Sequence, residues 1–148
     1  MNREIKFRAF VHNMLGGFMI PSENSDCFMV SNGNGFIVYD ENKNALKNNE
    51  FKLMQFTGFK DFDEKEIYEG DILEYISYMR DENKRKEIVG FDEKCGGWYV
   101  HKQADTLSDV LFKQHNEEWQ LKQNYKPSIK HKVRVIGNIY ENPELLTI

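Results

Sequence analysis

Cysteine and proline are scarce in this chain of 148 residues, which has two cysteines and three prolines. Cys27 and Cys95 lie far apart and outside any CxxC pair, so neither a disulfide scaffold nor a zinc site is expected. Free cysteines are often buried as small apolar residues, and we expect both thiols to be reduced.

Long apolar runs and a dominant charge of one sign are also absent. No segment has the apolar length needed to cross a bilayer, and residues 1–10 (MNREIKFRAF) lack the apolar core of a signal peptide. We therefore expect the protein in the cytoplasm. The net charge of −4 argues against non-specific binding to nucleic acid or membrane as the main activity, although it permits a local basic face.

Apolar residues are plentiful enough to form a core. Hydrophobic residues make up 40% of the chain and aromatic residues 14%, which argues against global disorder. The length suits one domain, or one domain with a small appendage.

Alternation of apolar and polar residues near the N-terminus predicts a strand with one buried face. Ile5, Phe7 and Ala9 form the apolar set, and basic residues separate them. The glycine pair at 16–17 and the two Asn-Gly pairs within residues 31–35 are turn sequences. They predict two hairpins within the first forty residues.

The rest of the chain continues the pattern of short strands. Residues 41–50 (ENKNALKNNE) are polar and are expected to form an exposed loop. A strand from Phe51 should run into a turn at Gly58, and residues 81–86 (DENKRK) should form a charged loop. Further strands are expected at residues 71–79, 87–92, 97–102 and 133–140, with Gly96-Gly97 at a hairpin tip.

One helix is expected at residues 106–119 (TLSDVLFKQHNEEW). Leu107, Val110, Leu111 and Gln114 share one face of it, and Asp105 or Thr106 could cap it. Together the patterns predict an α+β fold dominated by antiparallel strands. We expect an N-terminal β segment at residues 1–50 and a small barrel or rolled sheet at residues 51–148.

Residues 60–72 (KDFDEKEIYEGDI) hold six carboxylates and are the first candidate for a functional site. The calcium loop of an EF-hand fails here, because Lys65 and Glu66 occupy the fifth and sixth positions counted from Asp61. Paired carboxylates for glycoside chemistry can be drawn from any such segment. The favoured interpretation is two successive turns, with Asp61 and Asp63 bonding their own backbone and a bend at Gly70.

Other candidate sites are weaker. The four histidines, at positions 12, 101, 115 and 131, have no metal-pair spacing. Cys95 and His101 could form a thiol–imidazole pair, but catalysis would also need an orienting group and an oxyanion site, and nothing in the sequence demands either. The glycines at 33 and 35 lack the pattern of a dinucleotide site. We expect no catalytic residue, no metal and no cofactor.

Nucleic-acid binding is the alternative function, because small barrels often combine basic residues with exposed aromatic side chains. The basic residues form three groups: Arg3, Lys6 and Arg8; Lys84, Arg85 and Lys86; and Lys126, Lys130, Lys132 and Arg134. The aromatic residues that could stack on bases are Tyr75, Tyr78, Trp98 and Tyr99. Aromatic residues that alternate along strands are more often buried in the core, and no nucleic-acid-binding motif is present.

Three motifs resemble the YopX family, which consists of small proteins encoded by phages and prophages. They are REIKFRAF at residues 3–10, FTGFKDFDEKEIYEGDI at 56–72 and VIGNIYENPELL at 135–146. The motif residues are Lys6, Phe7, Arg8, Thr57, Gly58, Ile67, Tyr68, Glu69, Gly70, Asp71, Ile72, Ile136, Gly137, Asn138, Tyr140, Asn142 and Pro143. The chain departs from the family at Phe10, Phe59 and Asp63-Glu64.

The resemblance implies a mostly β fold, an SH3-like barrel in the central and C-terminal part, and self-association. It implies no activity and no catalytic residue. The residues themselves suggest that Gly137 marks a bulge or a close backbone approach, and that Asn142-Pro143 ends the last strand. Exposed strand edges also favour pairing with another copy. We therefore expect a non-enzymatic phage accessory protein that acts in the host cytoplasm through contacts with itself or with a phage or host protein.

Overall fold

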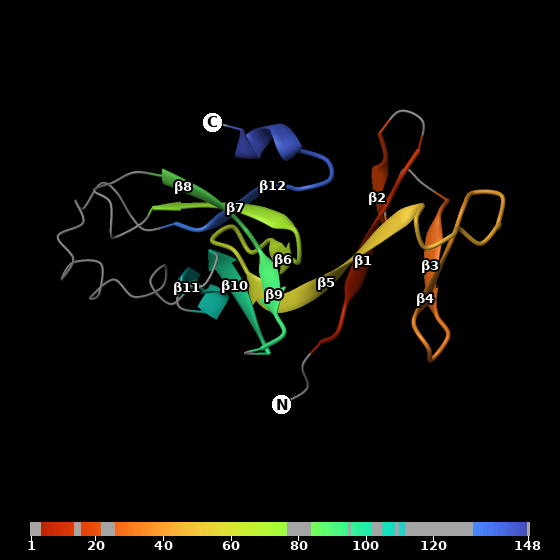
Figure 1. Ribbon diagram of the computed structural model, residues 1–148, viewed down its shortest axis with the longest axis horizontal. Helices are drawn as coiled ribbons and strands as arrows, with labels where there is room; N and C mark the ends of the chain where they lie inside the picture. Colours follow the sequence, from red (N-terminus) through yellow and green to blue (C-terminus); the bar gives the residue numbers. More distant parts are fainter. Residues whose placement is uncertain are drawn as a thin grey trace. The chain divides into compact units, whose positions relative to one another are not determined.

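The computed structural model describes residues 4–13, 16–21, 26–76, 84–94, 96–101, 105–108, 110–111 and 132–147 (Figure 1). Strands dominate these residues, which confirms the predicted mainly β architecture. The chain divides into two compact units, Met1–Phe56 and Thr57–Ile148. Separate domains at 1–50 and 51–148 stay a prediction. No helix in the described ranges is long and apolar enough to cross a membrane.

The first unit contains a three-strand arrangement and a separate hairpin. Strand β1 (Phe7–Val11) pairs antiparallel with β2 (Phe18–Ile20) and with the first part of β5 (Phe51–Lys60). Strand β3 (Phe28–Ser31) pairs antiparallel with β4 (Phe36–Tyr39). Both predicted hairpins are therefore confirmed, although the second turn has four residues, because Ser31 pairs with Phe36.

The single buried face predicted for the first strand is wrong in part. Ile5 is 69% exposed and precedes β1, whereas Ala9, Phe10 and Val11 are all buried. Successive side chains of a strand point to opposite faces, so the burial of these three consecutive residues shows that both faces of β1 are covered at this point. On one face the ring of Phe10 lies against Gly17, where no Cβ would fit.

The core of the first unit is built around the buried residues Ala9, Val11, Ile20, Val38 and Phe51. The polar segment at 41–50 is a mostly exposed loop, as predicted, and it contains turns. The Asp40 carboxylate holds one of them by accepting hydrogen bonds from the backbone and side-chain nitrogens of Asn44. These bonds lower the pKa of Asp40.

Strand β5 does not end in a turn at Gly58, as the sequence suggested. The strand continues to Lys60, because Gly58 adopts a φ of 88° within it and bends the strand without ending it. Strand β6 (Glu66–Tyr68) follows the acidic turn and lies next to β5 in the sheet.

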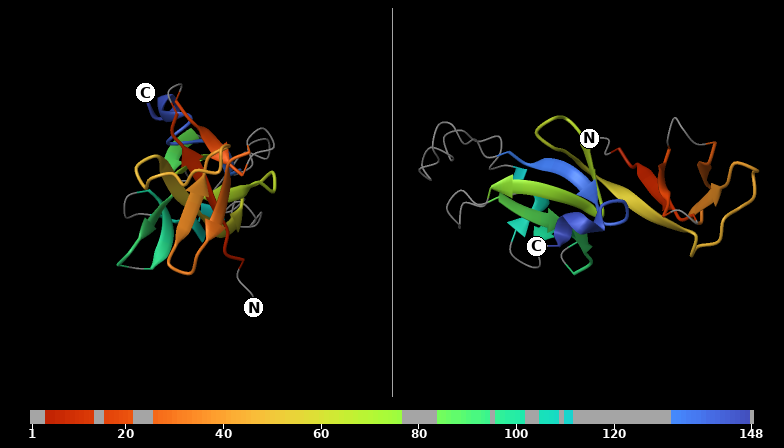
Figure 2. Two further views of the ribbon diagram at one scale, coloured as in Figure 1. Left: turned by 90° about the vertical axis from the view of Figure 1, so that its right-hand side faces the viewer. Right: turned by 90° about the horizontal axis from the view of Figure 1, so that it is seen from above.

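Two three-stranded sheets make up most of the second unit (Figure 2). In one, β7 (Asp71–Ile76) lies between β8 (Lys84–Ile88) and β12 (Arg134–Asn138). Residues 84–86 are therefore part of a strand, and their prediction as loop is wrong. In the other sheet, β10 (Gly97–His101) lies between β9 (Gly90–Asp92) and β11 (Asp105–Thr106).

Val89 is the corner between the two sheets, because it separates β8 from β9 by one residue. Its backbone is bonded on both sides: the Val89 N–H donates to the Asp71 carbonyl, and the Gly70 N–H donates to the Val89 carbonyl. Strands that bend from one sheet into another are typical of rolled sheets and barrels. The hairpin between β9 and β10 is confirmed, with Gly96 at a φ of 64° in its turn.

The sheets of the second unit share one core. Its buried members are Ile67, Leu73, Tyr75, Val89, Trp98, Val100, Leu107, Val110, Leu111 and Val133. The apolar face predicted for residues 106–119 thus contributes three buried residues. The rest of that segment, including Gln114, lies largely outside the described residues, so the helix stays a prediction.

Gly137 shows both features predicted for it. The pairing of β12 with β7 shifts between Val135 and Gly137, which leaves Ile136 as the extra residue of a bulge. A Cβ on Gly137 would lie 2.9 Å from the Asn142 Cβ and 2.8 Å from a methyl carbon of Leu145. The short 3-10 helix η1 (Pro143–Leu146) begins with the proline expected in a first turn.

We expect Gly137→Ala to lower the free energy of unfolding by about 1–3 kcal/mol, because the added methyl group overpacks against Asn142. Gly97→Ala is the matched control, since its Cβ would meet no atom within 4 Å. Urea unfolding followed by tryptophan fluorescence measures both. Equal stability of the two variants would show that no close packing occurs at Gly137.

Candidate functional site

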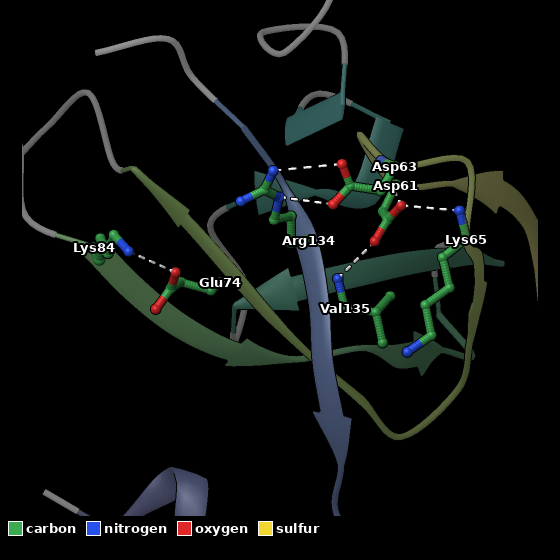
Figure 3. A network of polar contacts seen from close by, with 7 residues as sticks. All are labelled: Asp61, Asp63, Lys65, Glu74, Lys84, Arg134 and Val135. Atoms are coloured by element: carbon green, nitrogen blue, oxygen red, sulfur yellow. Dashed lines mark hydrogen bonds and ion pairs between the residues drawn. The ribbon is translucent and has the colours of Figure 1, made fainter. Parts of the chain in front are cut away.

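The acidic segment forms a tight turn that is held by the Asp61 carboxylate. Asp61 is 2% exposed, and its Oδ1 accepts hydrogen bonds from the backbone N–H groups of Asp63 at 2.8 Å and Lys65 at 3.0 Å (Figure 3). The Asp61 N–H donates to the Lys65 carbonyl at 2.8 Å, and Glu64 adopts a positive φ of 64°. These bonds confirm the turn and the predicted role of Asp61. The same role predicted for Asp63 is wrong, because the Asp63 carboxylate contacts the Arg134 side chain and not its own backbone.

The second oxygen of Asp61 makes a contact across a long stretch of sequence. Oδ2 accepts a hydrogen bond from the Val135 N–H at 2.9 Å, and the neighbouring Phe62 N–H donates to the Val133 carbonyl at 2.9 Å. A side-chain carboxylate thus takes the place that a backbone carbonyl would have in a strand pair. The turn after β5 is thereby joined to β12.

The Gly70-Asp71 bend uses a carboxylate in a similar way. Asp71 is 1% exposed, and its Oδ2 accepts a hydrogen bond from the Tyr68 N–H at 2.8 Å. Gly70 has a φ of 78°, and its carbonyl accepts a hydrogen bond from the Ile139 N–H. The bend therefore connects β6 with β7 and contacts the end of β12.

The C-terminal motif turns around Asn138, which is 4% exposed. Its Oδ1 accepts hydrogen bonds from the N–H groups of Tyr140 at 3.0 Å and Glu141 at 2.9 Å, and its Nδ2 donates to the Glu141 carboxylate at 2.6 Å. Upstream, the buried Thr57 hydroxyl donates to the Ile67 carbonyl at 2.8 Å. These polar side chains bond backbone groups that turns and bulges leave unpaired.

The structure brings two of the three family motifs together. Residues 57–72 and 136–143 meet in the second unit, where Asn138 pairs with Asp71 and Gly137 pairs with Ile72. Lys6, Phe7 and Arg8 lie in the first unit, where the Lys6 carbonyl accepts a hydrogen bond from the Phe56 N–H.

The acids of the segment are engaged in different ways. Asp61 and Asp71 bond backbone groups, Asp63 pairs with Arg134 through an N–O distance of 2.8 Å, and Glu64 approaches Lys60 at 3.8 Å. Across the part of the chain that the structure describes, no three His, Cys, Asp or Glu side chains are arranged to hold a metal ion. The arrangement can order turns, and it gathers no acid–base pair around a cleft.

Two of the aromatic residues proposed for base stacking are in the core. Tyr75 is 3% exposed and Trp98 is 8% exposed, so neither offers a free ring face. Tyr99 is half-buried, with its ring over Gly90. Several residues that the sequence analysis considered for a site lie outside the described residues: Arg3, Tyr78, Cys95, His115, Lys126, Lys130 and His131.

Among the described residues, sequence reasoning missed five exposed large apolar side chains: Phe28, Val30, Phe62, Ile88 and Phe91. Phe62 is 39% exposed in the acidic turn, and Phe28 and Val30 are 42% and 45% exposed on β3. The sequence held a signal for Phe62, because an aromatic residue between the acids of a turn has few neighbours to bury it. A shallow groove of about 480 Å³ lies beside the β3–β4 turn, lined mainly by asparagine, phenylalanine and one lysine side chain.

We expect Asp61→Asn to lower the free energy of unfolding by about 1.5–3 kcal/mol, because hydrogen bonds to a buried carboxylate are lost or weakened. Asp63→Asn should cost at most about 1 kcal/mol, because its ion pair with Arg134 is exposed. Thermal and urea unfolding of the two variants test this difference. A larger loss for Asp63→Asn would contradict the role given to Asp61.

Burial, and secondarily the negative charge of Glu69, raises the pKa of Tyr140 above its ordinary value of 10.0. Stability from the neutral phenol is complete below the unfolded-state pKa and is lost as pH rises through the folded-state pKa. Glu69→Gln should lower the Tyr140 pKa only in part, because burial remains. An NMR titration of the tyrosine ring carbons measures it, with Glu144→Gln as the control, because Glu69 is the acid whose charge contributes to the shift. A pKa that does not change in Glu69→Gln would exclude the charge effect.

Comparisons with known proteins identify the family and a structure of the same fold. The family model described as YopX protein matches residues 6–147. The crystal structure of protein EF1440 from Enterococcus faecalis is similar over 98% of this chain and 99% of that chain, with 22% identity and a TM-score of 0.54, which shows a shared fold. No curated protein matches the sequence. Because the family match spans nearly the whole chain, the protein belongs to the YopX family.

Proposed function

We propose that this protein is a non-enzymatic accessory protein of a phage or prophage, which acts in the host cytoplasm through protein contacts and associates with itself. Its membership of the YopX family supports the phage origin. The motif side chains support a structural role, because Thr57, Asp71 and Asn138 are buried and bond backbone groups.

The observation that carries self-association is the exposed strand β3. In the described ranges, β3 pairs only with β4, and its residues Phe28 and Val30 are 42% and 45% exposed. The other side of β4 is partly covered, because the Leu46 N–H donates to the Val38 carbonyl. The edge of β3 is therefore the open edge of the β3–β4 hairpin.

The composition of the β3–β4 hairpin favours a second copy of this chain as the partner that pairs with the β3 edge. Neither FMVS in β3 nor FIVY in β4 contains a charged residue or a proline. Proteins that avoid edge pairing usually place lysine or proline on such strands. Two uncharged β3 edges can pair with each other across a two-fold axis, since the same surface then serves both subunits.

We also propose that the second unit is a small SH3-like barrel. Two contacts support it: the corner at Val89 leads from β8 into β9, and the bonds from Asp61 and Phe62 join the end of β5 to β12. Together they link both sheets to the strand before the acidic turn. A closed barrel removes strand edges from this unit, so the first unit is left as the place for pairing.

We expect the wild-type chain to form a multimer that persists on dilution, and Val30→Lys to dissociate it. A lysine on the β3 edge adds a charge that a second edge would have to bury. Size-exclusion chromatography with light scattering measures the mass of each species. Ile88→Lys is the matched control, because Ile88 is a similarly exposed β-branched residue on a strand of the second unit.

The control variant should keep the mass of the wild-type protein. A monomeric wild-type chain at every concentration would overturn self-association. If Ile88→Lys alone dissociates the multimer, the contact involves the second unit and the β3 assignment is wrong.

A further inference from the structure

Two basic side chains lie over the partly exposed ring of Phe62. The Lys132 ammonium is 4.5 Å from the ring centroid, and the Arg134 guanidinium carbon is 5.7 Å from it. Phe62 is 39% exposed, so its ring remains open to solvent in part. The side chain of Arg134 is 47% exposed and is ordered by its two contacts with the Asp63 carboxylate, at 2.8 and 3.4 Å.

The basic surface continues from Arg134 across the neighbouring strands. Arg134 lies opposite Glu74 on β7, and Glu74 lies opposite Lys86 on β8. Residues opposite each other in a sheet point to the same face, so these three side chains form one row. Lys84 joins the row, because its ammonium contacts the Glu74 carboxylate at 2.9 Å (Figure 3).

This face differs in charge from the protein as a whole. It gathers the basic residues Lys84, Lys86, Lys132 and Arg134, whereas the chain has a formal net charge of −4. Among the residues that the structure describes, the acids on this face are Asp63 and Glu74, and each contacts one of these cations. They therefore fix the positions of the cations and leave the face with a positive excess, the kind of local patch that attracts polyanions.

We propose that this face, from Phe62 across β12 and β7 to β8, binds single-stranded nucleic acid. The row of cations would follow the phosphates, and the Phe62 ring would stack on a base. Aromatic stacking combined with a basic track is how small barrels bind single strands without sequence preference. An acidic peptide could also bind the cations, but it would gain little from the exposed ring.

The first experiment measures binding to fluorescent oligothymidylate and oligouridylate of about twelve nucleotides, within the site size of small β-barrels. Fluorescence anisotropy at low salt should show saturable binding. If three or four phosphates are contacted, the slope of log K against log salt should be about −2 to −3. Absence of saturable binding to both oligonucleotides at low salt would overturn the proposal.

Variants locate the binding surface. Phe62→Ala should weaken binding by about 5- to 100-fold through lost stacking. The double variant Lys84→Gln and Lys86→Gln should weaken binding and make the salt slope shallower. Lys52→Gln with Lys47→Gln is the control, because it removes the same charge from exposed positions of the first unit. Equal weakening by the control pair would show binding through overall charge and would overturn the proposal.

Poly-glutamate of matched charge tests the nature of the ligand. Poly-glutamate should displace the oligonucleotide poorly from the wild-type protein and more readily from the Phe62→Ala variant. Displacement that is equally easy from both proteins would mean that the ring contributes nothing. Circular dichroism and thermal unfolding confirm that each variant is folded, and the exposed positions of all five substituted side chains make folding failure unexpected.

Discussion

The second unit depends on the hydrogen bonds that the Asp61 carboxylate accepts. One of its oxygens accepts two backbone hydrogen bonds within the acidic turn, and the other accepts one from Val135, which is far away in the sequence. Buried backbone donors without partners are costly, so a turn placed against a strand needs an acceptor at this point. A carboxylate can serve both directions at once, because it has two oxygens with several lone pairs. The same residue thereby forms a local turn and a long-range connection.

The use of acids as backbone acceptors explains why an acid-rich segment need not be a catalytic one. Asp61 and Asp71 are buried with their oxygens turned to N–H groups, and Asp63 points to Arg134 at the surface. Catalytic carboxylates instead converge on a cleft with room for a substrate. The binding capacity of the unit is better sought on its surface, where Phe62 and the cations around it are exposed.

The sequence predicted those features that depend on neighbouring residues. The two N-terminal hairpins, the acidic turn and the bulge at Gly137 follow from local turn chemistry and were correct. The bond from Asp61 to Val135 has no local signal, since it joins positions 74 residues apart. The burial of Tyr75 and Trp98 depends on which strand face meets the core, and alternation alone does not fix that choice. The glycine at position 58 suggested a turn, because glycine readily adopts a positive φ. A positive φ can either end a strand or bend it, and the strands that pair with β5 decide which of the two occurs.

The corner at Val89 has a consequence for how the second unit opens. Its N–H and carbonyl are bonded to the Gly70-Asp71 bend, and the strands on either side of it belong to different sheets. Both bonds hold Val89 to the start of β7, so separating the sheets would pull on this corner and expose the shared core. The unit should therefore lose its structure in one cooperative step, with these amide protons among the last to exchange with solvent.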